Sequence, residues 1–524
     1  MDWSTQPDPF RTYGGAPRLP LARPAPSQEP SYEEVFRPGH VAVDDLHGNS
    51  ISQLFFHSLA LSAWKQFQAS RWSLRVNPSS GNLHPTEAYL VCGPVPGLAT
   101  TAGIHHYHPY EHALELRAEL TAAEWQQLAE RLPEQCVLIG LTSIHWRESW
   151  KYGERAFRYC QHDAGHAIGA LAISAAVLGW QATLLESVDH ARLGTLLGVA
   201  AQTGIETEEP DCLLAVHPQG ITFPMGKNRA FSIPQVITDR LLTADFHGTP
   251  NKLSTAHHEW PVIDDVAAAC RRADVPSSAF WQQLEHDNSS LQVGDSSLPA
   301  RQIIRQRRSA VAMDARTGIT RGAFYQILLK VMPGRDQVPF PTLPWRPRIH
   351  LVLFVHRIQD LEPGSYFLNR NGRDLDELRG QLDPDYAWTR PPGCPDSLDL
   401  RCLHAGDARQ LARTISCHQD IAADGCFAAA MLAEFREPLR DYGPWFYKRL
   451  HWEAGLVGQV LYLEAEATGV RSTGIGCFFD DATHEALGIR DDRLQDLYHF
   501  TIGGAVEDTR LQTHPAYAHL EGGG

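Results

Sequence analysis

Four short groups of residues in this 524-residue chain could bind anions, border a planar ligand or move protons. Lys151-Tyr152 joins an amine to a phenol, and these can act as general base or acid when burial or a neighbouring charge shifts a pKa. Arg307-Arg308-Ser309 ends the densest basic cluster, and guanidinium groups bind phosphate oxygens in pairs. Residues 78–82 (PSSGN) offer hydroxyls, an amide and backbone N–H groups to a planar polar ligand. Gly474-Ile475-Gly476 allows the backbone to approach a flat ring or a phosphate.

Each group also has a purely structural explanation. Lysine and tyrosine are common on surfaces, a run of charges often marks a solvated helix end, and Pro, Ser, Gly and Asn form turns. A Gly-x-Gly pair after a helix can be its C-cap, and the polar segment that ends in Arg510 can be a tail. His162 and His166 stand four apart on a helix, but no third ligand is evident, and we expect no metal site.

The elements that must hold these groups include one helix that occurs twice. Residues 151–180 and 441–470 align without gaps, so that Tyr152 corresponds to Tyr442 and Gly165 to Gly455, 290 positions apart in each case. The first copy has apolar residues at helical spacing and small residues between them, which is typical of a helix packed on all sides. The repeat predicts two domains of one fold, joined in tandem.

Apolar runs and turn signals predict the elements around these helices. We expect strands at 87–92, 135–141, 211–217, 349–355 and 497–502, a hairpin at 104–107 and 113–116, and helices at 264–272 and 320–331. Thr320 is the expected N-cap of the last helix. Strands mixed with long helices predict an α+β fold, present twice.

Bulk composition excludes several classes of protein. A hydrophobic content of 43% and a charged content of 20% describe an ordinary globular chain. No apolar run reaches the roughly 18 residues needed to cross a bilayer, and the first residues lack a signal-peptide pattern, so we expect a cytoplasmic protein without a membrane partner. A net charge of −15 argues against a nucleic-acid partner. Ten scattered cysteines without a C-x-x-C pair predict buried, reduced thiols rather than disulfides.

The same patterns divide the chain into segments. We expect a loosely ordered, proline-rich arm at 1–30, a first domain at 31–240, a connector at 241–299, a second domain at 300–516 and a tail at 517–524.

Taken together, the motifs resemble the FMN-dependent nitroreductase superfamily, and more closely its SagB-type branch of thiazoline and oxazoline dehydrogenases. The matching segments occur in family order, over most of both halves, at 78–91, 103–116, 151–171, 307–309, 474–476 and 503–511. The resemblance implies two tandem nitroreductase-like domains, each with an antiparallel or mixed sheet, surrounding helices and a long central helix. In that family two subunits form an intertwined dimer with FMN at the interface, so the two domains are expected to form an intramolecular pseudo-dimer.

The resemblance also divides one flavin site between the two halves. From the second domain it assigns to FMN the residues Arg307, Arg308, Ser309, Gly474, Ile475, Gly476 and Arg510. From the first domain it assigns Pro78, Ser79, Ser80 and Asn82 to FMN, and it gives Lys151 and Tyr152 an acid/base role. The mirror-image site lacks its motifs, because 54–64 and 339–350 stand where Arg-Arg-Ser and Pro-Ser-Ser-Gly would be. One FMN per chain is therefore expected. Val311 departs from the family, which often has a basic residue there, and this departure implies that one phosphate contact is missing.

The function that the resemblance implies is a dehydrogenase or oxidase. Hydride would pass between flavin N5 and a heterocycle or a substrate derived from an amino acid or peptide, with O2 or another electron acceptor, while Lys151 or Tyr152 moves a proton. One alternative is a nitroreductase or flavin reductase that takes hydride from NAD(P)H. Another is a flavin-free subunit that binds a peptide for a partner enzyme, which Val311 favours slightly and the complementary retention of motifs disfavours. The expected form is a monomeric pseudo-dimer or a higher homo-oligomer.

Overall fold

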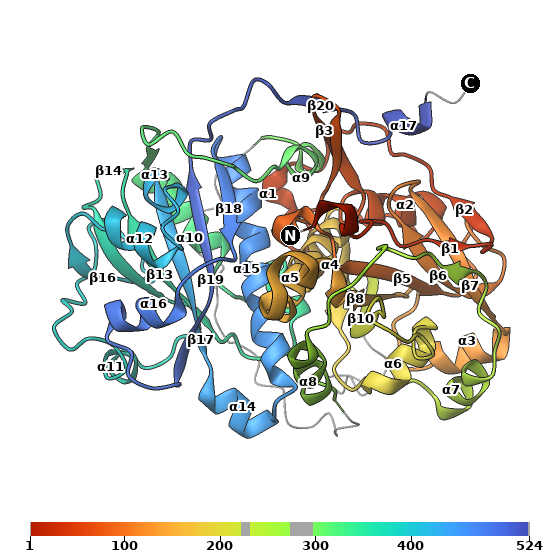
Figure 1. Cartoon of the computed structure of the whole chain (residues 1–524). Coiled ribbons are helices and arrows are strands. Elements are labelled where there is room, and N and C mark those ends of the chain that lie inside the picture. The colour runs from red at the N-terminus through yellow and green to blue at the C-terminus, as the bar shows by residue number, and fades with distance from the viewer. Residues whose placement is uncertain (1, 222–230, 273–296, 522–524) are drawn as a thin grey trace.

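The computed structural model describes residues 2–221, 231–272 and 297–521, and it shows two lobes packed against each other (Figure 1). The sheet of the first lobe has the strand order β2 (Arg18–Pro20), β7 (Ala113–Leu120), β6 (Ala102–His108), β5 (Thr86–Cys92), β8 (Val137–Ser143), β10 (Glu209–Pro218) and β9 (Trp180–Leu184). The sheet of the second lobe has the order β16 (Asp399–Ala405), β15 (Gly364–Asn369), β13 (Ile349–Val355), β17 (Phe427–Glu434), β19 (Leu494–Gly503) and β18 (Arg471–Ile475).

The two sheets share one topology. All neighbouring strands in both sheets are antiparallel, and β7-β6-β5-β8-β10-β9 matches β16-β15-β13-β17-β19-β18 strand for strand. Central strands such as β8 and β13 are buried along their whole length, which explains why the sequence shows continuous apolar runs there instead of alternation. The predicted α+β fold, present twice, is confirmed.

The repeated helix forms the centre of the molecule. Its copies are α5 (Ala156–Val177) and α15 (Phe446–Ala467), both 22 residues long, and they pack against each other between the two sheets (Figure 1). They cross at Gly165 and Gly455, where a Cβ on either glycine would strike a backbone carbonyl of the other helix, that of Trp452 or of His162. The small residues of the repeat therefore allow two backbones to touch.

The remaining elements surround this centre. The other helices are α1 (Tyr32–Val35), α2 (Gly48–Phe56), α3 (Ala122–Ala129), α4 (His145–Tyr152), α6 (His190–Leu197), α7 (Gln235–Leu242), α8 (Pro261–Ala269), α9 (Ala300–Gln306), α10 (Arg321–Lys330), α11 (Leu375–Arg379), α12 (Arg409–Ile415), α13 (Ile421–Asp424), α14 (Arg436–Tyr442), α16 (Asp480–Leu487) and α17 (Ala518–Glu521). Two short strand pairs join β1 (Tyr13–Gly14) to β11 (Thr249–Pro250) and β12 (Ile319–Thr320) to β14 (Ile358–Gln359). Thr320 caps α10 as predicted, since its side chain accepts the Ala323 N–H.

The C-terminal segment crosses from the second lobe to the first. Strand β20 (Gln512–His514) pairs with β3 (Leu61–Phe67), which pairs in turn with β4 (Ser70–Arg75), as the upper part of Figure 1 shows. Farther on, the Tyr517 hydroxyl donates to the Pro109 carbonyl at 3.1 Å. The two lobes are therefore joined by this C-terminal segment as well as by their central helices.

Two expectations from composition are wrong. The N-terminal segment is ordered, because β2 adds to the first sheet and the buried Arg11 forms an ion pair with Glu208 at 3.2 Å. Cys417 and Cys477 form a disulfide across 60 residues of sequence, whereas the other eight cysteines are buried thiols. The helix expected in the connector is present as α8, although residues 273–296 of that connector lie outside the described part of the chain.

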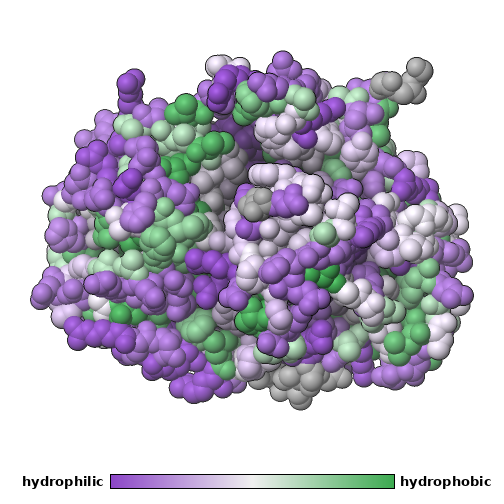
Figure 2. All heavy atoms as spheres, viewed as in Figure 1, coloured by the Kyte–Doolittle hydropathy of each residue, from purple (hydrophilic) through white to green (hydrophobic). Residues whose placement is uncertain are grey.

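The surface seen in Figure 2 is mostly hydrophilic, and its hydrophobic residues lie in separate groups. Within the described residues, no helix combines the length and the apolar character that spanning a bilayer would require.

Candidate functional site

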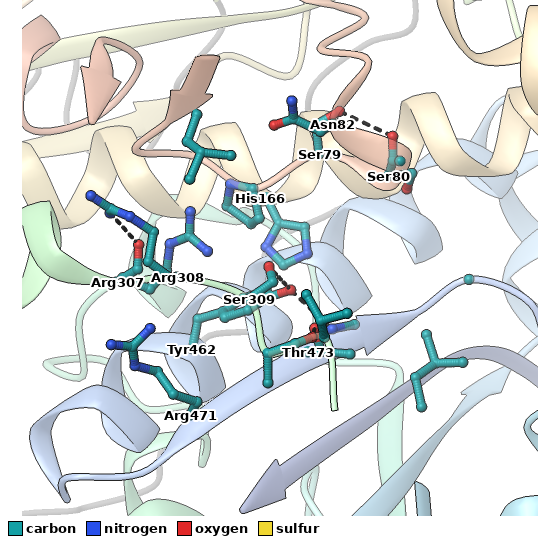
Figure 3. Close-up of a pocket in the computed structure, with 18 of the residues that line it drawn as sticks. Ser79, Ser80, Asn82, His166, Arg307, Arg308, Ser309, Tyr462, Arg471 and Thr473 are labelled. Atoms are coloured by element: carbon teal, nitrogen blue, oxygen red, sulfur yellow. Dashed lines mark hydrogen bonds between the residues drawn. The ribbon is translucent and has the colours of Figure 1, made fainter. Parts of the chain in front are cut away.

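A cavity of about 500 Å³ lies at the seam between the two lobes. This volume is typical of a small-molecule site. The sequence-predicted residues that line it are Pro78, Ser79, Ser80, Asn82, Tyr152, Arg307, Arg308, Ser309, Gly474, Ile475 and Gly476. In Figure 3 the serine loop lies on one side and the arginines with Tyr462 on the other, with His166 between them. The structure thus brings together motifs that are separated by up to about 400 positions in sequence.

The loop at 78–84 is fixed in place by a buried carboxylate of α5. Both oxygens of Asp163 accept from the Ser80 N–H, at 3.1 and 3.2 Å, and one also accepts from the Ser80 hydroxyl. Gly81 has φ +58°, and a Cβ there would lie 2.6 Å from the Tyr152 hydroxyl. Only glycine fits this turn, because it tolerates the positive φ and leaves room for the phenol.

The glycine loop after β18 lies against aromatic rings. The Gly474 N–H donates to the Tyr462 hydroxyl at 2.9 Å, and the same hydroxyl is 2.9 Å from the Ser309 hydroxyl. A Cβ on Gly474 would overlap the Tyr498 phenol, and one on Gly476 would lie 2.7 Å from the Tyr159 ring. Tyr462 therefore holds the Arg-Arg-Ser segment and the glycine loop together, and the glycines keep the cavity open.

The arginines of the cavity form an excess of positive charge. Arg307 is 4% exposed and donates to the backbone carbonyls of Val76 and Arg75, but its buried Nη1 has no hydrogen-bond partner among the described residues. Burial, together with the charges of Arg307, Arg305 and Arg471, lowers the pKa of Arg308 to about 9. An anion in the cavity would satisfy the orphaned N–H group and stabilise the cluster.

The Lys-Tyr pair stands at the serine loop, with the tyrosine facing the cavity. Burial and the carboxyl group of Glu148 raise the pKa of Tyr152, so its phenol keeps its proton at neutral pH. Lys151 does not line the cavity. Its Nζ lies 5.1 Å from the centre of the Tyr152 ring and 3.1 Å from the position that a Cβ on Gly81 would take.

Two buried carboxyl groups lie close to the same tyrosine. Burial raises the pKa of Asp163 to about 7, despite the hydrogen bonds from Ser79 and Ser80. Burial and the neighbouring Asp163 raise the pKa of Glu148 well above its usual value. Neither oxygen of Glu148 has a hydrogen-bond partner of normal geometry within the described residues, although the Ser79 hydroxyl lies within reach.

Arg510, which the resemblance assigns to FMN, lies outside the cavity wall in this structure, although its neighbours Asp508 and Leu511 line that wall. Its guanidinium forms a bidentate pair with Asp508, at 2.7 and 2.8 Å, on an exposed segment, and it does not line the cavity. The carboxylate of Asp508, two residues earlier in the chain, thus pairs with the guanidinium that the resemblance assigned to a phosphate. Val311 does line the cavity and is 86% exposed, so this position presents an apolar side chain to the cavity.

Comparison with known proteins agrees with this geometry. The model of the nitroreductase family matches residues 65–217 and 403–504. A solved protein from Anabaena variabilis, described as a nitroreductase, superposes with a TM-score of 0.67 over 97% of this chain and 95% of its own, at 20% identity. The chain has the nitroreductase fold. It carries that fold twice, once in each lobe.

Two further solved structures match parts of the chain. One is a protein from Ralstonia eutropha described as a nitroreductase, with a TM-score of 0.29, 15% identity, and coverage of 42% of this chain and 95% of its own. The other is the Escherichia coli microcin synthetase McbBCD complex with truncated pro-MccB17 bound, with a TM-score of 0.29, 14% identity, and coverage of 45% and 79%. No curated protein matches the chain.

Several residues that line the cavity of this nitroreductase fold were not predicted from the motifs. They include Lys65, Trp72, Arg75, Tyr159, Asp163, His166, Tyr462, Arg471 and Tyr498. One signal was available for Asp163, since a carboxylate recurs in the second copy of the helix, as Glu453. Glu453 has a similar task there, because it accepts the N–H groups of Arg348 and Ile349, where the corresponding loop enters β13. His162 and His166, considered above for a metal, instead contact the Tyr498 ring at 4.2 and 5.9 Å between centroids.

The mirror-image position of the glycine loop is filled. Glu186 corresponds to Gly476, and its carboxylate forms a buried ion pair with Arg449 at 2.9 Å. The Arg449 guanidinium also stacks on the rings of Trp345 and Trp445, at 5.0 and 4.4 Å. The space that remains among these side chains is about 30 Å³. No room is left there for a flavin-sized ring system.

A second cavity, of about 540 Å³, lies on that mirror side, but its chemistry differs. Ala172 and Ala176 line it where Tyr462 and Glu466 would stand in the first site. Arg335 is the one cation among the described residues of its wall, and Asp336 lines the same wall. This cavity lacks the cluster of arginines that marks the first.

We expect a pH signature from the Asp163 carboxyl. Its pKa is raised from 3.8 in the unfolded chain to about 7 in the folded one, so the folded state holds this proton more tightly. The associated stability is therefore fully present below about pH 4 and is lost as the pH rises to about 7. Relative to Asp163→Asn, the free energy of unfolding of the wild type should fall across this window, by on the order of a few kcal/mol. Denaturant titrations between pH 4 and 8 would measure the difference, and parallel curves for the two proteins would contradict the shifted pKa.

Proposed function

We propose that this chain is an FMN-dependent oxidoreductase of the SagB type. It dehydrogenates a heterocycle, or a substrate derived from an amino acid or peptide, at one active site in the cavity between the two lobes. The two lobes act as an intramolecular pseudo-dimer, since each supplies part of that site. The observation that carries the proposal is the meeting, in one cavity, of the Arg307–Arg308 cluster, the glycine loop and Tyr152.

The residues present fit FMN. The orphaned N–H of Arg307 and the mutual repulsion of the arginines match a phosphate, and Arg307 and Arg308 would hold it. Arg471 lines the same cavity but already pairs with Glu466 at 3.3 Å and Glu507 at 3.6 Å. Backbone and hydroxyl groups of the serine loop and the glycine loop supply polar contacts around a flat ring. The Arg510 contact of the resemblance has no support in this conformation, because Asp508 holds its guanidinium.

The residues of the chain have separate tasks in this reaction. Bound FMN would accept hydride from a carbon atom of the substrate. Tyr152 presents a protonated phenol to the cavity and positions the reacting group by donating a hydrogen bond. A substrate proton can move to this phenol only if the phenol passes its own proton on, and Lys151, Glu148 and Asp163 are nearby groups that can take part. Asp163 also fixes the serine loop through Ser80.

One FMN per chain is the expected stoichiometry. The mirror position is filled by Glu186 and Arg449, so only one cavity offers the arginine cluster within the described residues. Flavin released from the folded protein, quantified by absorbance against protein concentration, would measure the ratio. Two FMN per chain would show that the mirror site is active, whereas none would favour the flavin-free binding subunit.

A matched pair of variants tests the location of this FMN. Gly474→Val should abolish flavin binding, because its Cβ would overlap the Tyr498 phenol and fill the cavity. Leu184→Val, at the corresponding position of the first lobe, should leave the flavin content unchanged. Loss of flavin in the Leu184 variant alone would place the cofactor on the mirror side.

A further inference from the structure

The Cys417–Cys477 disulfide lies at the rim of the proposed flavin cavity. Cys477 directly follows Gly476 of the glycine loop and lines the cavity wall. Gln419, two residues after Cys417, lines the same wall and donates to the Cys477 carbonyl at 3.1 Å. The S–S bond thus ties the turn after β18 to the loop between α12 and α13, beside the space assigned to FMN.

This pair is accessible, unlike the other cysteines. Cys477 is exposed and Cys417 is half-buried, so the bond can be reached from the solvent as well as from the cavity. The eight remaining cysteines are buried, and burial raises the pKa of thiols such as Cys136 and Cys160, which makes them unreactive. Exposed disulfides are the ones that take part in exchange and redox chemistry.

The fold itself does not require the bond. Ser187 stands at the position of the first lobe that corresponds to Cys477, and the turn after β9 leads into α6 with no disulfide in the described residues. The same strand-to-helix turn is therefore closed in the first lobe without a disulfide, by packing and by hydrogen bonds such as that from the Arg192 N–H to Asp189. The disulfide is present only in the lobe whose glycine loop lines the cavity, which links it to the site rather than to stability.

We propose that Cys417–Cys477 is a second redox centre, which exchanges two electrons with the flavin of the cavity. The inference rests on the proposed function. In the forward direction the S–S bond accepts two electrons and two protons from FMNH2, so that two thiols form and oxidised FMN is left. A small-molecule disulfide then exchanges with the exposed Cys477 thiol, which restores the bond and releases two small thiols. The electron acceptor of the enzyme is then a disulfide.

An anaerobic reductive titration tests this exchange with the holoprotein. Dithionite is added in measured amounts, the flavin absorbance is followed, and Cys417 and Cys477 are alkylated and weighed by mass spectrometry. We expect the wild type to take up about two two-electron equivalents per flavin, and the Cys417→Ser/Cys477→Ser variant about one. Uptake of one equivalent by both proteins, with the wild-type peptides still joined, would overturn the proposal.

Two controls test whether the disulfide is reduced through the flavin and whether the effect is specific to the second lobe. Wild-type apoprotein, treated with dithionite for the same time, should keep the disulfide, because the electrons arrive through the flavin. Ser187→Ala, at the corresponding position of the first lobe, should titrate like the wild type. If the double variant loses its flavin, wild-type holoprotein and apoprotein still test the proposal. Equal alkylation of Cys417 and Cys477 in these two proteins would overturn it. A protein that binds no FMN at all would overturn the proposed function, and this inference with it.

Discussion

Lys151→Ala and Tyr152→Phe are each expected to keep the flavin bound and to slow its reduction by substrate by about 10²- to 10⁴-fold, the range typical of a lost acid or base. Tyr152 is the member of the pair that lines the cavity, and the Lys151 amine lies 5.1 Å from the centre of its ring. Neither side chain belongs to the arginine cluster, so flavin affinity should change little. Anaerobic stopped-flow absorbance at the flavin band would measure the rate of reduction.

The repeat supplies the control for this experiment. Tyr442 corresponds to Tyr152, but Asp441 replaces the lysine, and the Tyr442 ring packs at 5.0 Å from that of Phe446. Tyr442→Phe should therefore leave the rate unchanged. Equal damage from Tyr152→Phe and Tyr442→Phe would contradict a single active site. No damage from either first-lobe variant would favour a nitroreductase reduced by NAD(P)H, since hydride delivery from a nicotinamide needs no base from the protein.

The repeated helix was the part of the fold that sequence predicted best. The offset of 290 residues holds from end to end, since α5 and α15 begin and end at corresponding residues. The sequence did not show where the helix starts, because Gly153, at φ +56°, separates α4 from α5 and places Lys151 and Tyr152 on the shorter helix. Composition also failed for the N-terminal segment, whose order comes from tertiary contacts such as the burial of Arg11 beside Glu208.

The residues of the candidate site, too, could be predicted from sequence only where their role is local. Motifs with turn chemistry or charge could be found in the sequence, because glycine, serine and arginine are informative at short range. Asp163, Tyr462 and Tyr498 were missed because they lie within a helix or a strand that reads as core, and their role depends on loops from distant segments. The disulfide was missed for a similar reason, since its two cysteines are 60 residues apart and meet only when β18 has joined the sheet. The motif also did not show that the Arg510 guanidinium pairs with Asp508, two residues before it.

Arg307→Ala and Arg308→Ala should each weaken FMN binding by roughly 10- to 100-fold, which is the loss of one hydrogen bond to a charged group, about 1.5–3 kcal/mol. The reason is that both guanidinium groups are in an unfavourable environment when no ligand is bound. Arg307 holds a buried N–H with no partner in the described residues, and the pKa of Arg308 is lowered by burial and by the surrounding arginines. Both features are relieved by a bound phosphate. Titration of apoprotein with FMN, followed by flavin fluorescence, would give the two affinities.

Arg510→Ala is the matched control, because it removes the same side chain from a position that the resemblance assigned to FMN and the structure does not. The Arg510 guanidinium is exposed and paired with Asp508, so its loss should leave the affinity for FMN close to that of the wild type. If Arg510→Ala weakened binding as much as Arg307→Ala, the C-terminal segment would have to turn toward the ligand on binding. If Arg307→Ala and Arg308→Ala both left the affinity unchanged, the phosphate would bind elsewhere, and backbone carbonyls such as those of Val76 and Ser62 would be the partners that hold the two guanidinium groups in place.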